Sequence, residues 1–111
     1  MITCTFLRSG DALAGFECSG HAGFRRAGRD IFCAGVYVLS YTCANALESV
    51  AHVLPEVEID EKSGFLSLFL PQSLRTPEAE IILLTFRQGM KDLEETYPKF
   101  VSLTEKTIME E

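Results

Sequence analysis

The pattern of hydrophobic and polar positions changes period several times along the chain, and each period predicts one kind of element. Residues 2–8 and 13–19 alternate between apolar and polar side chains, which is typical of strands with one buried face. The turn formers Ser9, Gly10 and Asp11 separate these two runs and predict a β-hairpin. Its core face would carry Ile2, Cys4, Phe6, Ala14, Phe16 and Cys18.

An uncharged stretch then replaces the alternation. Residues 31–47 carry no formal charge, and we expect a helix over residues 31–54 that Pro55 ends. Polar residues inside the stretch favour a buried helix over a membrane span. The helix is apolar nearly all round, and only Glu48 and His52 look solvated, so one sheet could not cover it. A second subunit could supply the remaining cover, and we therefore expect a homodimer.

The second half of the chain repeats the order of hairpin and helix. Residues 57–60 and 65–70 predict a second hairpin, and Thr76 with Pro77 forms a helix start, with threonine as the cap and proline at the first helical position. Residues 100–106 alternate weakly and predict a possible final strand. Between them, apolar residues recur at helical spacing as far as Pro98: Ala79, Ile82, Leu83, Phe86, Met90, Leu93 and Tyr97.

These elements predict an α+β fold with two layers, in which a largely antiparallel sheet packs against two helices. The predicted order is ββαββα with a possible final β. We expect residues 1–111 to form a single domain, because this length buries a core without support from a metal or disulfides.

Composition and charge exclude some functions. The chain has 16 acidic and 10 basic residues and a net charge of −6, which argues against direct nucleic-acid binding. The first ten residues lack the features of a secretory signal, so we expect a cytoplasmic protein with free thiols. Of the four cysteines, Cys4, Cys18 and Cys43 fall on predicted core positions, and we assign them to packing.

The loop before the first helix carries the candidate chemistry. In the stretch GHAGFRRAGRDIFCAG, residues 20–35, Asp30 would cap the helix and place Cys33 in its first turn. Helix-terminal amides favour the thiolate there, although the charge of Asp30 opposes it. His21 lies 12 positions earlier, and the loop could fold back to bring its imidazole to the sulfur. A Cys–His pair is the minimum for nucleophilic acyl chemistry.

Other interpretations of the same loop remain open. Its glycines and arginines are the ingredients of a phosphate cradle, so a module that binds RNA or a nucleotide is the alternative function. A redox sensor could use the same reactive Cys33. Zinc bound by Cys18, His21 and Cys33 is disfavoured, because strand alternation turns Cys18 inward.

The stretch GHAGFRRAGRDIFCAGV also resembles the signature G-H-A-x5-G-x-D-[IV]-x-C-A-[AG]-[VI] of the bacterial ribosomal-processing cysteine proteases, the Prp family. The resemblance extends to chain length, element order and the ending YPKF at residues 97–100. It implies a homodimeric α+β cysteine protease that needs no metal or cofactor. The implied substrate is the N-terminal extension of large-subunit ribosomal protein twenty-seven.

Carried over by position, the resemblance makes Cys33 the nucleophile and His21 the general base and acid. The chain departs from the pattern at Tyr37, where many members have serine, so specificity could differ here. The implied supporting motif residues are Gly20, Ala22, Gly28, Asp30 and Ala34. The loop over residues 23–29 would close over the peptide, with Gly23, Arg25, Arg26 and Arg29 as candidate contacts.

Overall fold

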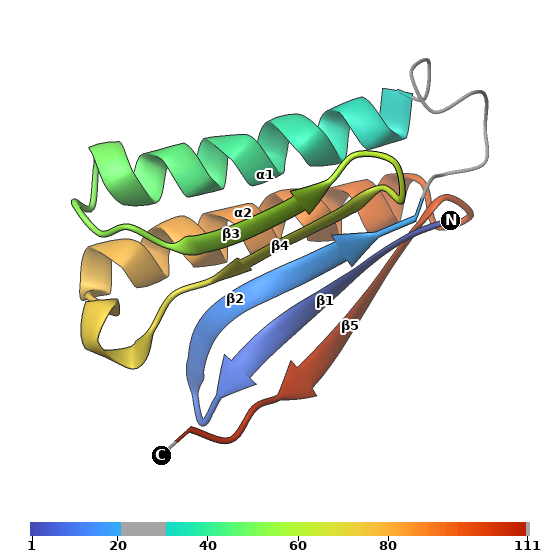
Figure 1. The fold of residues 1–111 in the computed structure, drawn as a ribbon. Helices are drawn as coiled ribbons and strands as arrows, with labels where there is room; N and C mark the ends of the chain where they lie inside the picture. The colour runs from blue at the N-terminus through green and yellow to red at the C-terminus, as the bar shows by residue number, and fades with distance from the viewer. Residues whose placement is uncertain (21–30, 111) are drawn as a thin grey trace.

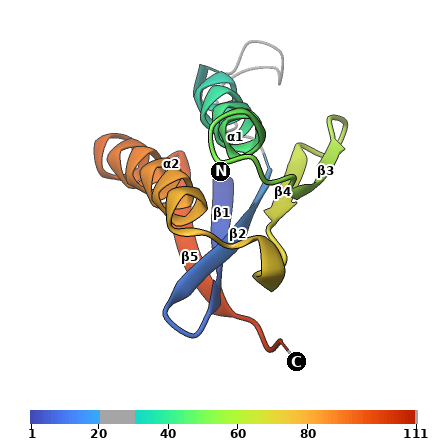
Figure 2. The same ribbon diagram turned by 90° about the vertical axis from the view of Figure 1, so that its left-hand side faces the viewer.

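Two helices cover one face of a five-stranded sheet in the computed structural model, which describes residues 1–20 and 31–110 (Figures 1 and 2). The sheet has the strand order β3-β4-β2-β1-β5. This is the predicted α+β fold with two layers. In chain order the elements are β1 (Ile2–Ser9), β2 (Ala12–Ser19), α1 (Ile31–Ser49), β3 (Glu56–Asp60), β4 (Phe65–Phe69), a 3-10 turn (Gln72–Leu74), α2 (Pro77–Thr96) and β5 (Val101–Thr107).

The final strand gives the sheet its mixed character. β1 with β2 and β3 with β4 pair antiparallel, as the two predicted hairpins require, and β2 and β4 join the hairpins with a third antiparallel pairing. β5 instead returns along the other edge of β1 and pairs with it in parallel, with Ile2 opposite Val101 and Cys4 opposite Leu103. The sheet is therefore largely antiparallel, and the possible final strand is confirmed.

The end of α1 corrects the sequence prediction. The helix stops at Ser49 rather than at residue 54, because the chain turns there: the amides of Val50 and Ala51 both donate to the carbonyl of Ala46, at 2.8 and 3.1 Å. His52 follows with a positive φ of 59°, which no helix can continue. His52 therefore lies beyond the helix and does not share its last turn with Glu48.

The outer side of α1 is also more exposed than predicted. Val36, Ser40, Cys43 and Leu47 are buried, and the hydroxyl of Ser40 donates to the carbonyl of Val36 at 2.7 Å. A polar residue therefore fits the buried face without an unpaired group. Over residues 34–49, the exposed residues run along the helix rather than gathering at its end: Ala34, Tyr37, Val38, Thr42, Asn45, Glu48 and Ser49.

The core lies between α2 and the middle strands. Phe86 of α2 stacks on Phe16 with ring centroids 3.9 Å apart and meets Phe6 edge-on at 6.2 Å. Thr76 caps α2 as predicted, since its hydroxyl accepts a hydrogen bond from the amide of Ala79 at 3.2 Å. The predicted apolar face of α2 is confirmed at its buried residues Ala79, Leu83, Phe86 and Met90, whereas Tyr97 follows the helix as its C-cap and is 41% exposed.

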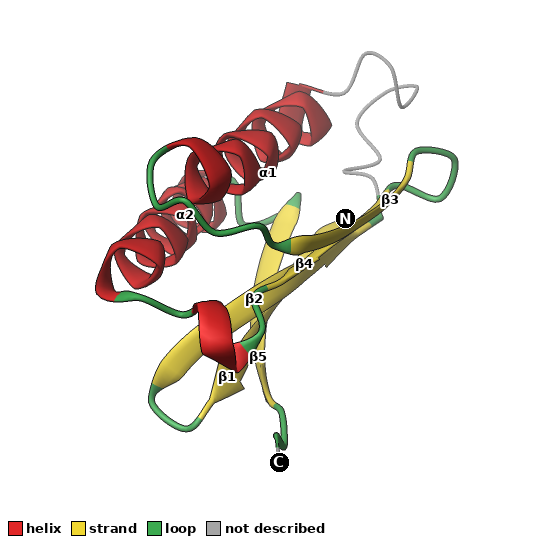
Figure 3. Ribbon diagram, turned by 60° about the vertical axis from the view of Figure 1, so that its left-hand side comes forward, coloured by secondary structure: helices red, strands yellow, loops and turns green. Residues whose placement is uncertain are grey.

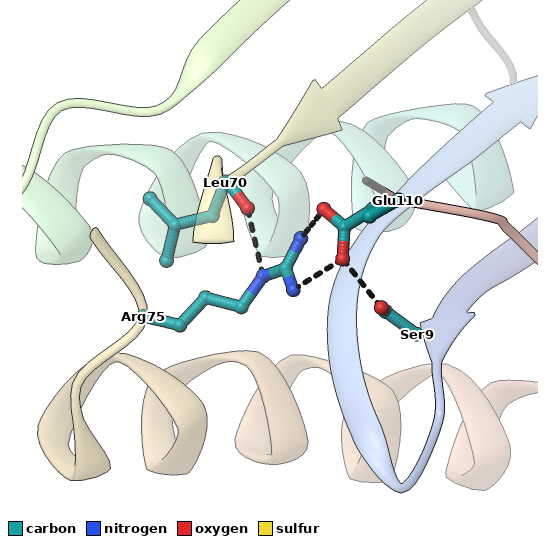
Figure 4. A network of polar contacts seen from close by, with 4 residues as sticks. All are labelled: Ser9, Leu70, Arg75 and Glu110. Carbon is teal, nitrogen blue, oxygen red and sulfur yellow. Dashed lines mark hydrogen bonds and ion pairs between the residues drawn. The ribbon is translucent and has the colours of Figure 1, made fainter. Parts of the chain in front are cut away.

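A polar network ties the residue before α2 to the end of the chain (Figure 4). The Nε of Arg75 donates to the carbonyl of Leu70 at 2.9 Å, and its guanidinium pairs with the carboxylate of Glu110 through two hydrogen bonds. Ser9 donates to the same carboxylate from the end of β1. The pKa of Glu110 falls from 4.5 to about 2, because Arg75 and then Ser9 hydrogen-bond its charged form.

Candidate active site

The candidate site lies where β2 ends and α1 begins. Gly20, the residue after β2, and the first residues of α1 flank the segment 21–30 (Figure 1). Gly20 has a φ of 88°, and a Cβ there would lie 2.5 Å from the carbonyl oxygen of Met1. Any side chain would be strained and would collide with backbone, so this motif glycine has a structural reason of its own.

The first turn of α1 carries Cys33, as predicted, at the third position of the helix. Amides in a first turn lack partners within the helix, and the helix dipole adds positive potential there. The turn contains no acidic residue of its own. An anionic sulfur or a developing oxyanion is the charge that such a turn stabilises.

Of the predicted site residues, Gly20, Cys33 and Ala34 lie in the described part of the chain. Ala34 lies on the exposed face of α1, and Gly20 lies beside the N-terminus as described above. The side chain of Cys33 is not described. The residues that lie outside the described part of the chain are His21, Ala22, Gly23, Arg25, Arg26, Gly28, Arg29 and Asp30. The proposed approach of His21 to Cys33, the capping by Asp30 and the phosphate cradle therefore stay predictions.

The other three cysteines belong to the core, as predicted. Cys4 and Cys18 face each other across β1 and β2 with their sulfurs 2.8 Å apart, and both are buried. The hydrogen bond from Cys18, followed by burial, raises the pKa of Cys4. Burial raises the pKa of Cys43 to about 12. These raised values keep Cys4 and Cys43 protonated at neutral pH, so neither suits the role of nucleophile.

A cluster that the sequence did not reveal lies one helical turn beyond Cys33. Tyr37 of α1 donates a hydrogen bond to Oε1 of Glu61 at 3.1 Å, from the turn between β3 and β4. The hydroxyl of Tyr41 therefore donates to that of Tyr37, which has only one proton to give.

The spacing of residues in the sequence indicates the two tyrosines of this cluster but not its carboxylate. Tyr37 stands out as a departure from the family pattern, and a second tyrosine four residues later shares its helix face. Glu61 is 24 residues from Tyr37 and sits in a turn with no motif, so only the fold brings it there. Figure 3 shows the β3–β4 turn at the same end of the sheet as the end of β2.

The described residues contain neither a metal-binding cluster nor a membrane-spanning helix. Within residues 1–20 and 31–110, no three His, Cys, Asp or Glu side chains lie close enough together to hold a metal ion. None of the helices in this described part is both long enough and apolar enough to span a membrane.

Comparison with known proteins identifies the family. A family described as cysteine protease Prp matches residues 1–102. The ribosomal processing cysteine protease Prp of Bacillus subtilis (strain 168) is 36% identical over 91 residues, which are 81% of this chain and 80% of that protein. The protein of the same name from Staphylococcus aureus (strain Mu50) is 29% identical over 89 residues, 78% of this chain and 81% of that protein.

Solved structures agree in fold along almost the whole chain. A crystal structure of a Streptococcus mutans protein superimposes with a TM-score of 0.87 at 32% identity, covering 97% of this chain and 96% of that one. The essential ribosomal processing protease Prp of S. aureus, in complex with a covalently linked product peptide, gives 0.87 at 25% identity and covers 96% of this chain and all (100%) of that one. The family match and the Bacillus relative together confirm the predicted enzyme class: this chain belongs to the Prp family of cysteine proteases.

Proposed function

We propose that the protein is an endopeptidase that removes the N-terminal extension of large-subunit ribosomal protein twenty-seven, with Cys33 as nucleophile and His21 as general base and acid. The observation that carries the proposal is the place of Cys33 in the first turn of α1, within the stretch matched by the family. The names of the relatives support the substrate class, since they are ribosomal processing proteases.

The mechanism follows from the chemistry of a thiol and an imidazole at a helix start. His21 takes the proton of the Cys33 thiol, and the thiolate attacks the scissile carbonyl carbon. Amides of the first turn of α1 stabilise the tetrahedral oxyanion. The protonated His21 then donates its proton to the leaving amine, which departs with the C-terminal fragment. Water, deprotonated by His21, hydrolyses the thioester and frees Cys33.

The remaining residues of the motif have supporting roles in this proposal. Asp30 caps α1, while Gly20, Ala22, Gly28 and Ala34 shape the chain on either side of the two reacting groups. Residues 23–29 close over the peptide, with Gly23, Arg25, Arg26 and Arg29 as contacts. The reaction as proposed consumes only peptide and water, so it requires no cofactor or metal.

The test is cleavage of a synthetic peptide that covers the extension of the host's own ribosomal protein, with products identified by mass spectrometry. We expect a single cut by the wild type, none by Cys33→Ala, and cleavage slowed by orders of magnitude in His21→Ala. Cys43→Ala is the matched control, because it removes a buried thiol and should still cut.

Retained cleavage in Cys33→Ala would refute the assignment of the nucleophile. A wild type that leaves the peptide intact would refute the substrate. The glycine- and arginine-rich loop would then return to the RNA- or nucleotide-binding interpretation, which titration with both ligands would test.

We also propose that the protein acts in the cytoplasm as a homodimer. The exposed side of α1 supports the dimer, since Val38 is 65% exposed in the single chain. Sedimentation equilibrium should give twice the 12.3 kDa mass of one chain. A mass of one chain at micromolar concentration would contradict the dimer.

A further inference from the structure

We propose that Tyr37, Tyr41 and Glu61 form a subsite for a lysine or arginine side chain of the substrate peptide, and that they set the specificity of this enzyme on one side of the scissile bond. This inference rests on the proposed function, because it assumes that a peptide passes the first turn of α1. It adds a recognition element made by a helix and a distant hairpin.

The geometry of the cluster presents two aromatic rings and a carboxylate together. The rings of Tyr37 and Tyr41 are tilted by 50° with centroids 4.2 Å apart, and Tyr37 donates to Glu61 at 3.1 Å. Glu61 is exposed, and Tyr37 is 37% exposed. A cation is attracted both to the face of an aromatic ring and to a carboxylate, so the three residues match the chemistry of a basic side chain.

The carboxylate of Glu61 has hydrogen-bond acceptor positions that Tyr37 does not use. A carboxylate has about four acceptor positions, and the hydrogen bond from Tyr37 uses one of them. No arginine or lysine in the described part of the chain forms an ion pair with Glu61; the ion pairs there join Arg8, Arg75 and Arg87 to other carboxylates. The hydroxyl of Tyr37 positions the carboxylate, and Glu61 is exposed.

The charge around the cluster favours the same ligand. β3 and the turn after it carry four acidic residues, and the only basic residue in that stretch is Lys62. The acidic residues are Glu56, Glu58, Asp60 and Glu61, and all four are exposed. The network of Arg75 and Glu110, in contrast, already pairs its carboxylate with a guanidinium inside the fold. A negative surface beside the cluster raises the local concentration of a basic peptide.

The spacing along α1 places the subsite close to the bond that is cut. Tyr37 follows Cys33 by four residues, about 6 Å along the helix axis at ~1.5 Å per residue. An extended peptide advances about 3.3 Å per residue. A basic residue within about two or three positions of the scissile bond could therefore place its charge at Glu61.

Binding by an inactive enzyme tests the subsite separately from cleavage. The probe is a fluorescein-labelled peptide covering the extension and the residues after the cut, in which each lysine present is replaced in turn by norleucine, which keeps the stem and removes the charge. Affinities are measured by fluorescence anisotropy for Cys33→Ala alone and combined with Glu61→Gln. Glu58→Gln is the matched control, because it removes one exposed carboxylate from β3 and Glu58 opposes Ser67 rather than the core residue Leu66.

We expect one norleucine substitution to weaken binding to Cys33→Ala about 5-fold, as one exposed ion pair with a cation–π contact can supply. Glu61→Gln should abolish that difference, and Glu58→Gln should keep it within about 2-fold. Tyr37→Phe, which retains the ring but releases Glu61, should reduce the difference without abolishing it.

Several results would overturn the subsite: no lysine position with a preference, a preference that Glu61→Gln leaves unchanged, or an equal loss in Glu58→Gln. Absence of peptide binding to Cys33→Ala would overturn it too. The proposed function fails separately, through absence of cleavage by the wild type, and a lysine preference that depends on Glu61 would still support the subsite in that case.

Discussion

The two helices of this fold begin in different chemical settings. Thr76 caps α2 by accepting a hydrogen bond from the amide of Ala79. Glu78 and Glu80 in its first turn place negative charge at the positive end of the helix dipole. α1 has no acidic residue in its first turn, and Cys33 occupies it. The first turn of α2 thus carries its own compensating charge. The first turn of α1 carries none, and beside the cap proposed for Asp30 its positive potential acts on Cys33.

The polar contacts near the two helix N-termini also differ, since those near α2 are enclosed and those near α1 are exposed. Arg75, which precedes α2, is enclosed by Leu70 and Glu110, and the side chains of the ion pair are only 12% and 16% exposed. Tyr37, one turn into α1, makes its polar contacts with exposed groups. A polar network with its bonding capacity filled holds structure together, and one with open capacity can bind a ligand.

The largest effect that would test this comparison is loss of the α2 cap. Thr76→Ala should lower the free energy of unfolding by about 1 kcal/mol, because the amide of Ala79 loses its acceptor. Urea unfolding measures the loss, and kcat/KM of the folded enzyme should stay unchanged. Thr85→Ala is the control on the same helix: its exposed hydroxyl donates to the carbonyl of Ile81 within the helix. We expect it to shift stability by less than about 0.5 kcal/mol.

An equal loss of stability in Thr76→Ala and Thr85→Ala would show that the cap adds nothing to α2. A fall in kcat/KM for Thr76→Ala would show that the start of α2 contributes to function as well. Either outcome would remove the distinction between a structural and a chemical helix start.

A smaller effect is expected from acid at the network that anchors Arg75. The folded state holds the pKa of Glu110 at about 2, below its ordinary 4.5. A lowered pKa stabilises the fold above the ordinary value, and this contribution is lost as pH falls from 4.5 towards 2. The difference in unfolding free energy between wild type and Glu110→Gln should therefore shrink across this window.

Urea unfolding of both proteins between pH 5 and 2 measures that difference, and NMR of the side-chain carboxyl of Glu110 follows its titration directly. The comparison with Glu110→Gln isolates this group from the other acidic residues. A midpoint close to 4.5 would contradict the enclosed ion pair and would make the two networks alike.

Much of the fold could be predicted because local chemistry determined it. The alternation in the first two strands, the turn at Ser9–Asp11 and the Thr76–Pro77 start all depend on residues adjacent in sequence. The end of α1 was predicted wrongly, since Pro55 forbids a helix beyond it but does not require one up to it. The left-handed residue, His52, had no sequence signal, because it is neither glycine nor asparagine.

The candidate site likewise combines a residue that the sequence could place with contacts that only the fold creates. Cys33 could be placed from sequence, because its position depends only on where α1 starts, and the motif identified the family that the comparisons confirm. Tyr41 and Glu61 were missed as partners of Tyr37. Their contact depends on how the β3–β4 turn approaches α1, and no spacing along the chain records that approach.

By itself the sequence determined the identity of the elements, the family and the residue in the first turn of α1, because period, capping and motif are properties of neighbouring residues. The tertiary structure alone decided that β5 pairs in parallel with β1, that Arg75 meets Glu110 across 35 positions, and that Glu61 reaches Tyr37. These contacts join segments far apart in the chain. Their geometry is set by which apolar faces pack together, and that packing is a property of the whole molecule.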